Sequence, residues 1–75
     1  VPHFANSIAS SGVAVSRSDI QPGDVVCYDY GDGYCGHVGI YVGGGQVIHA
    51  SNSREDVRYA NMDMMSIMTI RRFIQ

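Results

Sequence analysis

Apolar residues occur in short runs along this chain and often alternate with polar ones, a pattern typical of β-strands separated by turns. The runs are rich in Val, Ile and Tyr, and Gly, Asp, Asn and Ser stand between them. They predict about five strands, over residues 24–29, 36–42, 46–51, 57–60 and 67–74.

Residues 2–10 carry the pattern of one short helix. Pro2 suits a first helical position and Gly12 suits the residue after a helix end. Residues 13–23 hold turn-forming residues and predict an extended connector. The fold class we predict is therefore α+β, a small twisted antiparallel sheet of about five strands with one short N-terminal helix.

The stretch 36–51 (GHVGIYVGGGQVIHAS) predicts a hairpin with a histidine on each arm. If the loop is the three glycines 43–45, His37 and His49 share one face on a diagonal where their side chains can meet. The pairs would then be Val42 with Gln46, Gly39 with His49, and His37 with Ser51. A two-residue loop would shift every pair by one position and send the two histidines to opposite faces.

Alternation along the first arm of this hairpin also predicts which residues are buried. It places Val38, Ile40 and Val42 on one face, which we interpret as the core. His37 and Tyr41 then lie on the other face, where an imidazole remains accessible for chemistry.

Two histidines in this arrangement suggest acid–base chemistry. In that interpretation His37 accepts a proton, and His49 holds the His37 ring in the tautomer that leaves its other nitrogen available. Each histidine alone is more often a surface or hydrogen-bonded strand residue. A metal site of Cys35, His37 and His49 is a weaker alternative, because the close ligand spacing of structural zinc sites is absent. We expect no metal and no cofactor.

The two cysteines leave more than one interpretation open. Cys27 and Cys35 could form a disulfide in an oxidising compartment, or remain thiols. Cys35 would share a face with His37 if the strand began that early, but residues 34–36 have loop composition. We therefore do not expect Cys35 to be a nucleophile, and Cys27 is most simply a small buried apolar residue.

Composition excludes several classes of partner. The chain has 75 residues, enough for one domain at most, and 45% of them are hydrophobic. With a net charge of −2 and five basic residues it has no basic footprint for nucleic acid. No run approaches the roughly 20 apolar residues of a membrane span. We expect neither nucleic acid binding nor a membrane span.

Three motifs in order carry a resemblance to a known family. From Val15 to Phe73 the chain resembles the NlpC/P60 group of papain-like cysteine hydrolases, which cut bacterial cell-wall peptides. The matching segments are 18–26 (SDIQPGDVV), 36–42 (GHVGIYV) and 47–51 (VIHAS). The resemblance implies the sheet half of a papain-like domain, with His37 as general base and His49 as the orienting member of a Cys-His-His set.

The cysteine of such a set is missing where the resemblance places it. In the family it lies upstream, in a Cys-Ser-Gly-like motif at the start of a helix, and residues 1–23 contain no cysteine. The expectation is that residues 1–75 are the C-terminal portion of a single peptidase domain whose helical part is absent, so that this chain alone is inactive. A remnant that cannot catalyse is the alternative.

The resemblance also implies a substrate, partners and a location. The substrate would be the peptidoglycan stem peptide. The bond cut would be the amide that joins the side-chain carboxyl of D-glutamate to the diamino acid. The partners would be this peptide and the upstream fragment that carries the cysteine, in a secreted or cell-envelope protein. Two alternatives are a papain-like amidase or acyltransferase with another substrate, and a noncatalytic cell-wall binding module with exposed Tyr28, Tyr30, Tyr34 and Tyr41.

Overall fold

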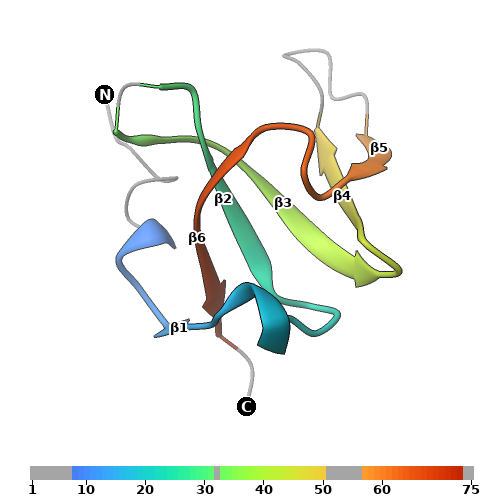
Figure 1. The fold of residues 1–75 in the computed structure, drawn as a ribbon, viewed down its shortest axis with the longest axis horizontal. Helices are drawn as coiled ribbons and strands as arrows, with labels where there is room; N and C mark the ends of the chain where they lie inside the picture. The colour runs from blue at the N-terminus through green and yellow to red at the C-terminus, as the bar shows by residue number, and fades with distance from the viewer. Residues whose placement is uncertain (1–7, 32, 51–56, 74–75) are drawn as a thin grey trace.

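The computed structural model describes residues 8–31, 33–50 and 57–73, which form one six-stranded antiparallel sheet (Figure 1). The strand order is β1-β6-β2-β3-β4-β5, so the first and last parts of the described chain meet at one edge. The strands are β1 (Val13–Ala14), β2 (Val25–Asp29), β3 (Cys35–Gly43), β4 (Gln46–Ala50), β5 (Val57–Asn61) and β6 (Ser66–Arg72).

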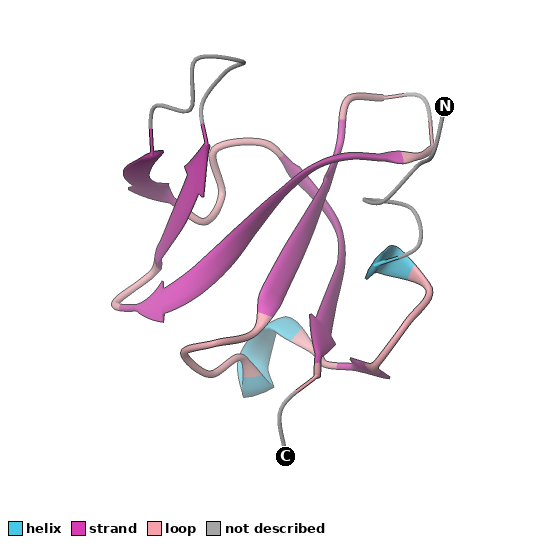
Figure 2. Cartoon of the chain, turned by 180° about the vertical axis from the view of Figure 1, so that it is seen from behind, coloured by secondary structure: helices cyan, strands magenta, loops and turns pink. Residues whose placement is uncertain are grey.

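The antiparallel sheet is as predicted, but the strand count and the fold class need correction. A sixth strand, β1, lies inside the predicted connector and pairs with the end of β6, Val13 opposite Arg72 and Ala14 opposite Arg71. In the predicted helix 2–10, Ile8 and Ala9 are helical, and residues 1–7 lie outside the described part. The other helical element described is a 3-10 turn, η1 (Arg17–Asp19), so the described chain is mostly β rather than α+β (Figure 2).

The glycine hairpin has the predicted register along most of its length but a different loop. The predicted pair of Val42 with Gln46 is wrong, because Gly43 pairs with Gln46. Ser51, the predicted partner of His37, lies outside the described residues. Ile40 pairs with Ile48 and Tyr41 with Val47, as a three-residue loop would require. The turn itself has two residues, Gly44 and Gly45, whose φ angles of 63° and 78° suit a type I′ turn. A bulge before Gly43 adds one residue to β3 and restores the register that the shorter loop would have lost.

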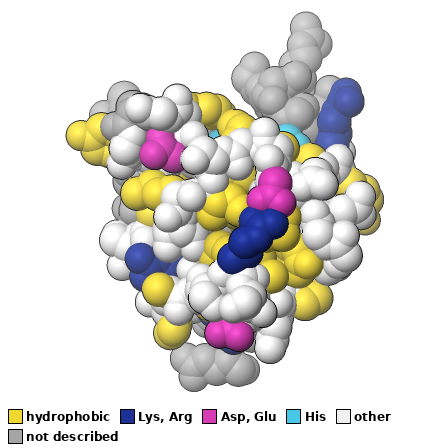
Figure 3. All heavy atoms as spheres, in the orientation of Figure 1, with side chains coloured by type: hydrophobic (Ala, Val, Ile, Leu, Met, Phe, Trp, Pro, Cys, Tyr) yellow, Lys and Arg dark blue, Asp and Glu magenta, His cyan; other side chains and the backbone are white. Residues whose placement is uncertain are grey.

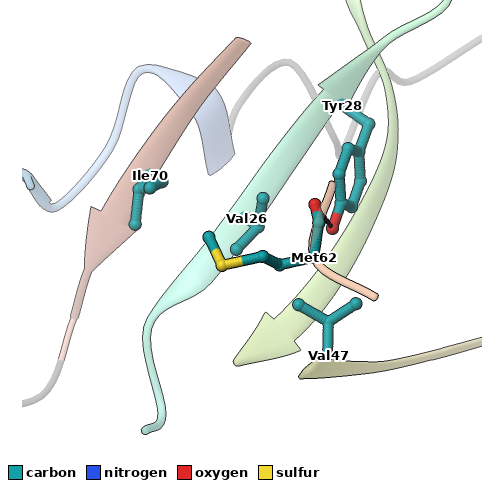
Figure 4. Packing of buried hydrophobic residues seen from close by; sticks show 5 residues of the cluster. All are labelled: Val26, Tyr28, Val47, Met62 and Ile70. Carbon is teal, nitrogen blue, oxygen red and sulfur yellow. Dashed lines mark hydrogen bonds between the residues drawn. The ribbon is translucent and has the colours of Figure 1, made fainter. Parts of the chain in front are cut away.

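The core lies on the opposite face of β3 from the one predicted. Ile40 and Val42 are 47% and 39% exposed, and Val38 is only half-buried. The face that carries Tyr41 packs instead against the main core cluster, formed by Val26, Tyr28, Val47, Met62 and Ile70 (Figure 4). Alternation showed which residues share a face, but the methionines between β5 and β6 decide which face is covered.

Tyr28 is the largest fully buried side chain among the described residues. Its hydroxyl donates a hydrogen bond of 2.8 Å to the carbonyl of Met62, which ties β2 to the turn between β5 and β6 (Figure 4). Burial, and secondly the charge of Asp63, raises the pKa of Tyr28 to about 12. The hydroxyl is therefore a neutral donor throughout the physiological range.

Replacing Tyr28 with Phe is expected to lower the free energy of unfolding by about 1 to 2 kcal/mol, because the Met62 carbonyl loses its partner in a dry site. The urea midpoint measures this loss. Tyr59→Phe is the matched control, since Tyr59 is a strand tyrosine that is 67% exposed. Equal midpoints for the two variants would contradict the role assigned to the Tyr28 hydroxyl.

An ion pair between the buried Asp24 and the partly exposed Arg72 fixes the residues that precede β2. Asp24 is 2% exposed and accepts two hydrogen bonds of 2.8 Å, from Nε and Nη2 of Arg72 on β6. The Gln21 amide donates a third, of 2.9 Å. These bonds, above all those from Arg72, hold the pKa of Asp24 below its usual value in spite of burial. Asp24 thus joins the turn before β2 to the last strand.

None of the helices in the described part of the chain is both long and apolar enough to cross a membrane.

Candidate active site

His37 on β3 and His49 on β4 are in direct contact. Nε2 of His37 lies 2.8 Å from Nδ1 of His49, a hydrogen-bond distance. The ring centroids are 5.0 Å apart and the ring planes are nearly perpendicular, at 87°. The sequence predicted that these two side chains share a face and can meet, and the geometry confirms it; their catalytic roles stay a prediction.

His37 also has an aromatic neighbour on the adjacent strand β2. His37 lies opposite Tyr28 in the β2–β3 pair, and the tilted Tyr28 ring lies 6.2 Å from the His37 ring. Tyr28 is in turn held by its hydrogen bond to Met62. His37 therefore has a rigid aromatic neighbour on one side and His49 on the other. This support was not predicted from the sequence, although the alternation within β2 and β3 carries the signal for it.

The electrostatics favour a neutral His37. Burial, and secondly the charge that His49 can carry, lowers the pKa of His37 from its usual value. At neutral pH the ring is therefore uncharged and can accept a proton. When His37 carries its hydrogen on Nε2 and donates it to His49, Nδ1 is the nitrogen left to act as a base.

Neither cysteine of the chain lies beside this base. The strand β3 does begin at Cys35, earlier than predicted, but a bulge at Gly36 places Cys35 on the opposite face from His37. There it packs with Cys27 and Ala9. Its Sγ contacts the backbone carbonyl oxygen of His37, at 3.5 Å, rather than the imidazole ring of that residue.

Both cysteines are buried, and neither is part of a disulfide. Burial, and secondly a hydrogen bond with the Cys35 thiol, raises the pKa of Cys27 to about 12. A thiol with this pKa stays protonated at neutral pH and is a poor nucleophile. The suggested metal set of Cys35, His37 and His49 does not converge, and the described residues contain no group of three or more His, Cys, Asp or Glu that could hold a metal ion.

The tyrosine face suggested for a binding module is not formed as expected. Tyr28 is fully buried, and Tyr41 is half-buried with its hydroxyl accepting a 3.0 Å hydrogen bond from the Gly45 amide. Tyr30 and Tyr34 are 64% and 62% exposed. The Tyr30 ring covers Gly36, where any Cβ would collide with it.

Comparison with known proteins identifies the family of this chain. The sequence matches the NlpC/P60 family over residues 1–72. It is 45% identical over 62 residues to "Probable endopeptidase p60" of Listeria seeligeri, covering 83% of this chain and 11% of that protein. It is 41% identical over 63 residues to "Probable endopeptidase Rv2190c" of Mycobacterium tuberculosis, covering 84% of this chain and 16% of that protein. The chain thus spans less than a fifth of the length of either relative.

Solved structures show the same fold. NlpC1 from Trichomonas vaginalis superposes with a TM-score of 0.81 at 35% sequence identity, covering 92% of this chain and 27% of that one. An NlpC/P60 family protein from Bacillus cereus superposes with a TM-score of 0.85 at 23% identity, covering 95% of this chain and 25% of that one. The family match, the relatives and the structures lead to one conclusion: this chain belongs to the NlpC/P60 family, and its homologues are probable endopeptidases.

Proposed function

We propose that this chain supplies the histidine half of the active site of a cysteine endopeptidase. Its substrate is the peptidoglycan stem peptide, and the bond cut is the amide that joins the side-chain carboxyl of D-glutamate to the diamino acid. The observation that carries the proposal is the 2.8 Å contact between His37 Nε2 and His49 Nδ1, which leaves His37 Nδ1 as a base. Family membership with probable endopeptidases supports it.

The nucleophilic thiol comes from polypeptide outside these 75 residues. Cys27 and Cys35 are both buried on the face opposite His37, so neither can reach a substrate held at the histidine pair. The partners we propose are therefore a thiol-bearing helical segment and the stem peptide. A cell-wall substrate places the protein in the cell envelope or outside the cell.

The proposed reaction uses His37 as a proton carrier. The thiol proton passes to Nδ1 of His37, and the thiolate sulfur bonds to the carbonyl carbon of the amide. The C–N bond then breaks while His37 returns the proton to the departing amine, leaving a thioester. Water adds to the thioester carbonyl and gives a proton to His37. The C–S bond then breaks, which releases the acid, and His37 returns the proton to the thiolate.

The test starts with the native protein. Intact mass spectrometry under denaturing conditions identifies any polypeptide joined to, or purified with, these residues, and the same sample is incubated with purified peptidoglycan. We expect new free amines on the diamino acid and new side-chain carboxyls on D-glutamate, and we expect iodoacetamide to prevent both. Cleavage that survives complete thiol alkylation, or cleavage confined to another bond, would overturn the proposal.

His49 is proposed as a positioning residue that acts through His37. His49→Ala should lower kcat by about 10- to 100-fold with little change in KM, because a poorly oriented base loses its alignment. Loss of the His49 charge should also raise the pKa of His37, moving the acid limb of the rate profile to higher pH. His49→Asn retains a hydrogen-bond acceptor and should recover part of the rate. An unchanged pH profile with equal rates for both variants would argue against this role.

A further inference from the structure

We propose that Tyr28 is a positioning residue of the active site, whose aromatic ring holds the imidazole of His37 in one orientation. The effect on the reaction rate rests on the proposed function, while the effect on the His37 ring can be measured without catalysis. The two parts of Tyr28 then have separate roles. The ring orients the base, and the hydroxyl stabilises the fold through Met62.

The hydrogen bond to His49 does not fix the His37 ring by itself. It holds a single ring atom, Nε2, at 2.8 Å from Nδ1 of His49. The torsion that joins an imidazole to its Cβ has broad energy minima, so a ring held at one atom can still tilt. Nδ1, the nitrogen proposed as the base, would move with that tilt. A second contact is therefore required to fix the direction of Nδ1.

Tyr28 supplies this second contact from the other side of the ring. It lies directly opposite His37 in the β2–β3 pair, so the two side chains share a face, with Cβ atoms about 4.5 to 5.5 Å apart. The ring centroids are 6.2 Å apart, and the ring planes are inclined by 33°. His37 therefore lies between an aromatic ring on β2 and a hydrogen-bonded ring on β4, and a tilt toward β2 brings it against Tyr28.

The Tyr28 ring is itself fixed at both ends. Its Cβ belongs to β2, which pairs with β3 on one side and β6 on the other. Its hydroxyl is bonded to the Met62 carbonyl, and its side chain is completely buried in the main core cluster (Figure 4). A catalytic group keeps a productive geometry when the residues around it are locked by packing in this way.

The same ring limits the access of water to His37. His37 is half-buried, and on the face seen in Figure 3 only small areas of histidine reach the surface. In the described chain, Tyr28 and His49 are the titratable groups that face His37, while Arg58 lies opposite His49 and Cys35 lies on the other face. Because Tyr28 stays neutral up to a pKa of about 12, it acts on His37 by excluding water rather than by charge.

The test compares Tyr28→Leu, which removes the ring, with Tyr28→Phe, which keeps the ring and loses only the hydroxyl. NMR coupling constants of the native protein should show His37 in one rotamer, and an NMR titration should give its pKa below the ordinary value. Tyr28→Leu should give averaged rotamers, raise the pKa of His37 and lower kcat by about 10- to 100-fold with little change in KM. The acid limb of its rate profile should move to higher pH.

Two further variants separate orientation from stability. Tyr28→Phe should restore the single rotamer, the lowered pKa of His37 and most of the rate, although it unfolds more easily than the native protein. Ile70→Val is the control, because Ile70 belongs to the same core cluster but lies on β6, two strands from His37. It should lower the Tm and leave the rotamer and the pKa of His37 unchanged.

The outcomes separate the role of Tyr28 from the proposed function. Averaged His37 rotamers in the native protein, or a Tyr28→Leu variant with the native rotamer and pKa of His37, would overturn the positioning role. Equal changes in Tyr28→Leu and Tyr28→Phe would show a structural role only and would also overturn it. If Tyr28→Leu does not fold, the native protein and Tyr28→Phe decide, since both must keep His37 in one rotamer. If the native protein cleaves no peptidoglycan, the proposed function fails, and the NMR measurements still decide whether Tyr28 orients His37.

Discussion

Replacing His37 with alanine should abolish release of stem-peptide fragments, lowering the rate by about a thousandfold or more. The alanine variant has no group to take the thiol proton or to return it to the departing amine. His49 cannot substitute for it, because His49 lies on the neighbouring strand β4, and His37 stands between His49 and Tyr28. Chromatography with mass spectrometry of the peptidoglycan digest measures the loss.

The folded state should survive this change. His37 is half-buried, its ring is bonded to His49, and the residues of the main core cluster are all retained. Thermal unfolding of the variant is the control, and a Tm within a few degrees of the parent value assigns the lost activity to chemistry. Full activity in a folded His37→Ala variant would refute the proposed role of His37.

The second large effect should follow from replacing Asp24 with alanine. The side chain is 2% exposed, so its loss leaves Nε of Arg72 and the Gln21 amide without their acceptor. We expect the free energy of unfolding to fall by about 2 to 3 kcal/mol, as for a lost hydrogen-bonded charge. Urea unfolding at pH 7 measures the change. Asp63→Ala is the control, because its ion pair with Arg17 is exposed and should add little.

The same carboxylate gives a pH dependence with a defined sign. The pKa of Asp24 is lower in the folded protein than in the unfolded chain, so the unfolded chain binds the proton more tightly. Its contribution to stability is therefore complete above pH 3.8, the ordinary value, and is lost as the pH falls toward the folded pKa. Asp24→Asn should remove this part of the acid dependence. If the free energies of unfolding of the native protein and of Asp24→Asn stay parallel from pH 6 to pH 2, Asp24 does not have this role.

The sequence was sufficient to predict the histidine pair, because strand alternation and three consecutive glycines limit the hairpin to few registers. It did not show that a two-residue turn and a bulge would combine to give that register. Nor did it show that the bulge at Gly36 turns Cys35 away from His37. Bulges depend on contacts between strands, which a local pattern does not contain.

The sequence also could not identify the covered face of the sheet or the neighbour of His49. The covered face depends on where the β5–β6 turn places Met62, Met64 and Met65. The pairing of His49 with Arg58 depends on the register of two strands joined through residues 51–56. Each of these facts joins segments that are distant in sequence, and each required the three-dimensional structure.

The hairpin turn also restricts how its length can change during evolution. The register of β3 and β4 depends on two offsetting irregularities, the short Gly44-Gly45 turn and the bulge before Gly43. An insertion or deletion of one residue in either place would shift the pairing of β4 with β3 by one residue. His49 would then lie on the opposite face of the sheet from His37. Related sequences that keep both histidines should therefore vary here by substitution, or by paired length changes, rather than by single-residue gaps.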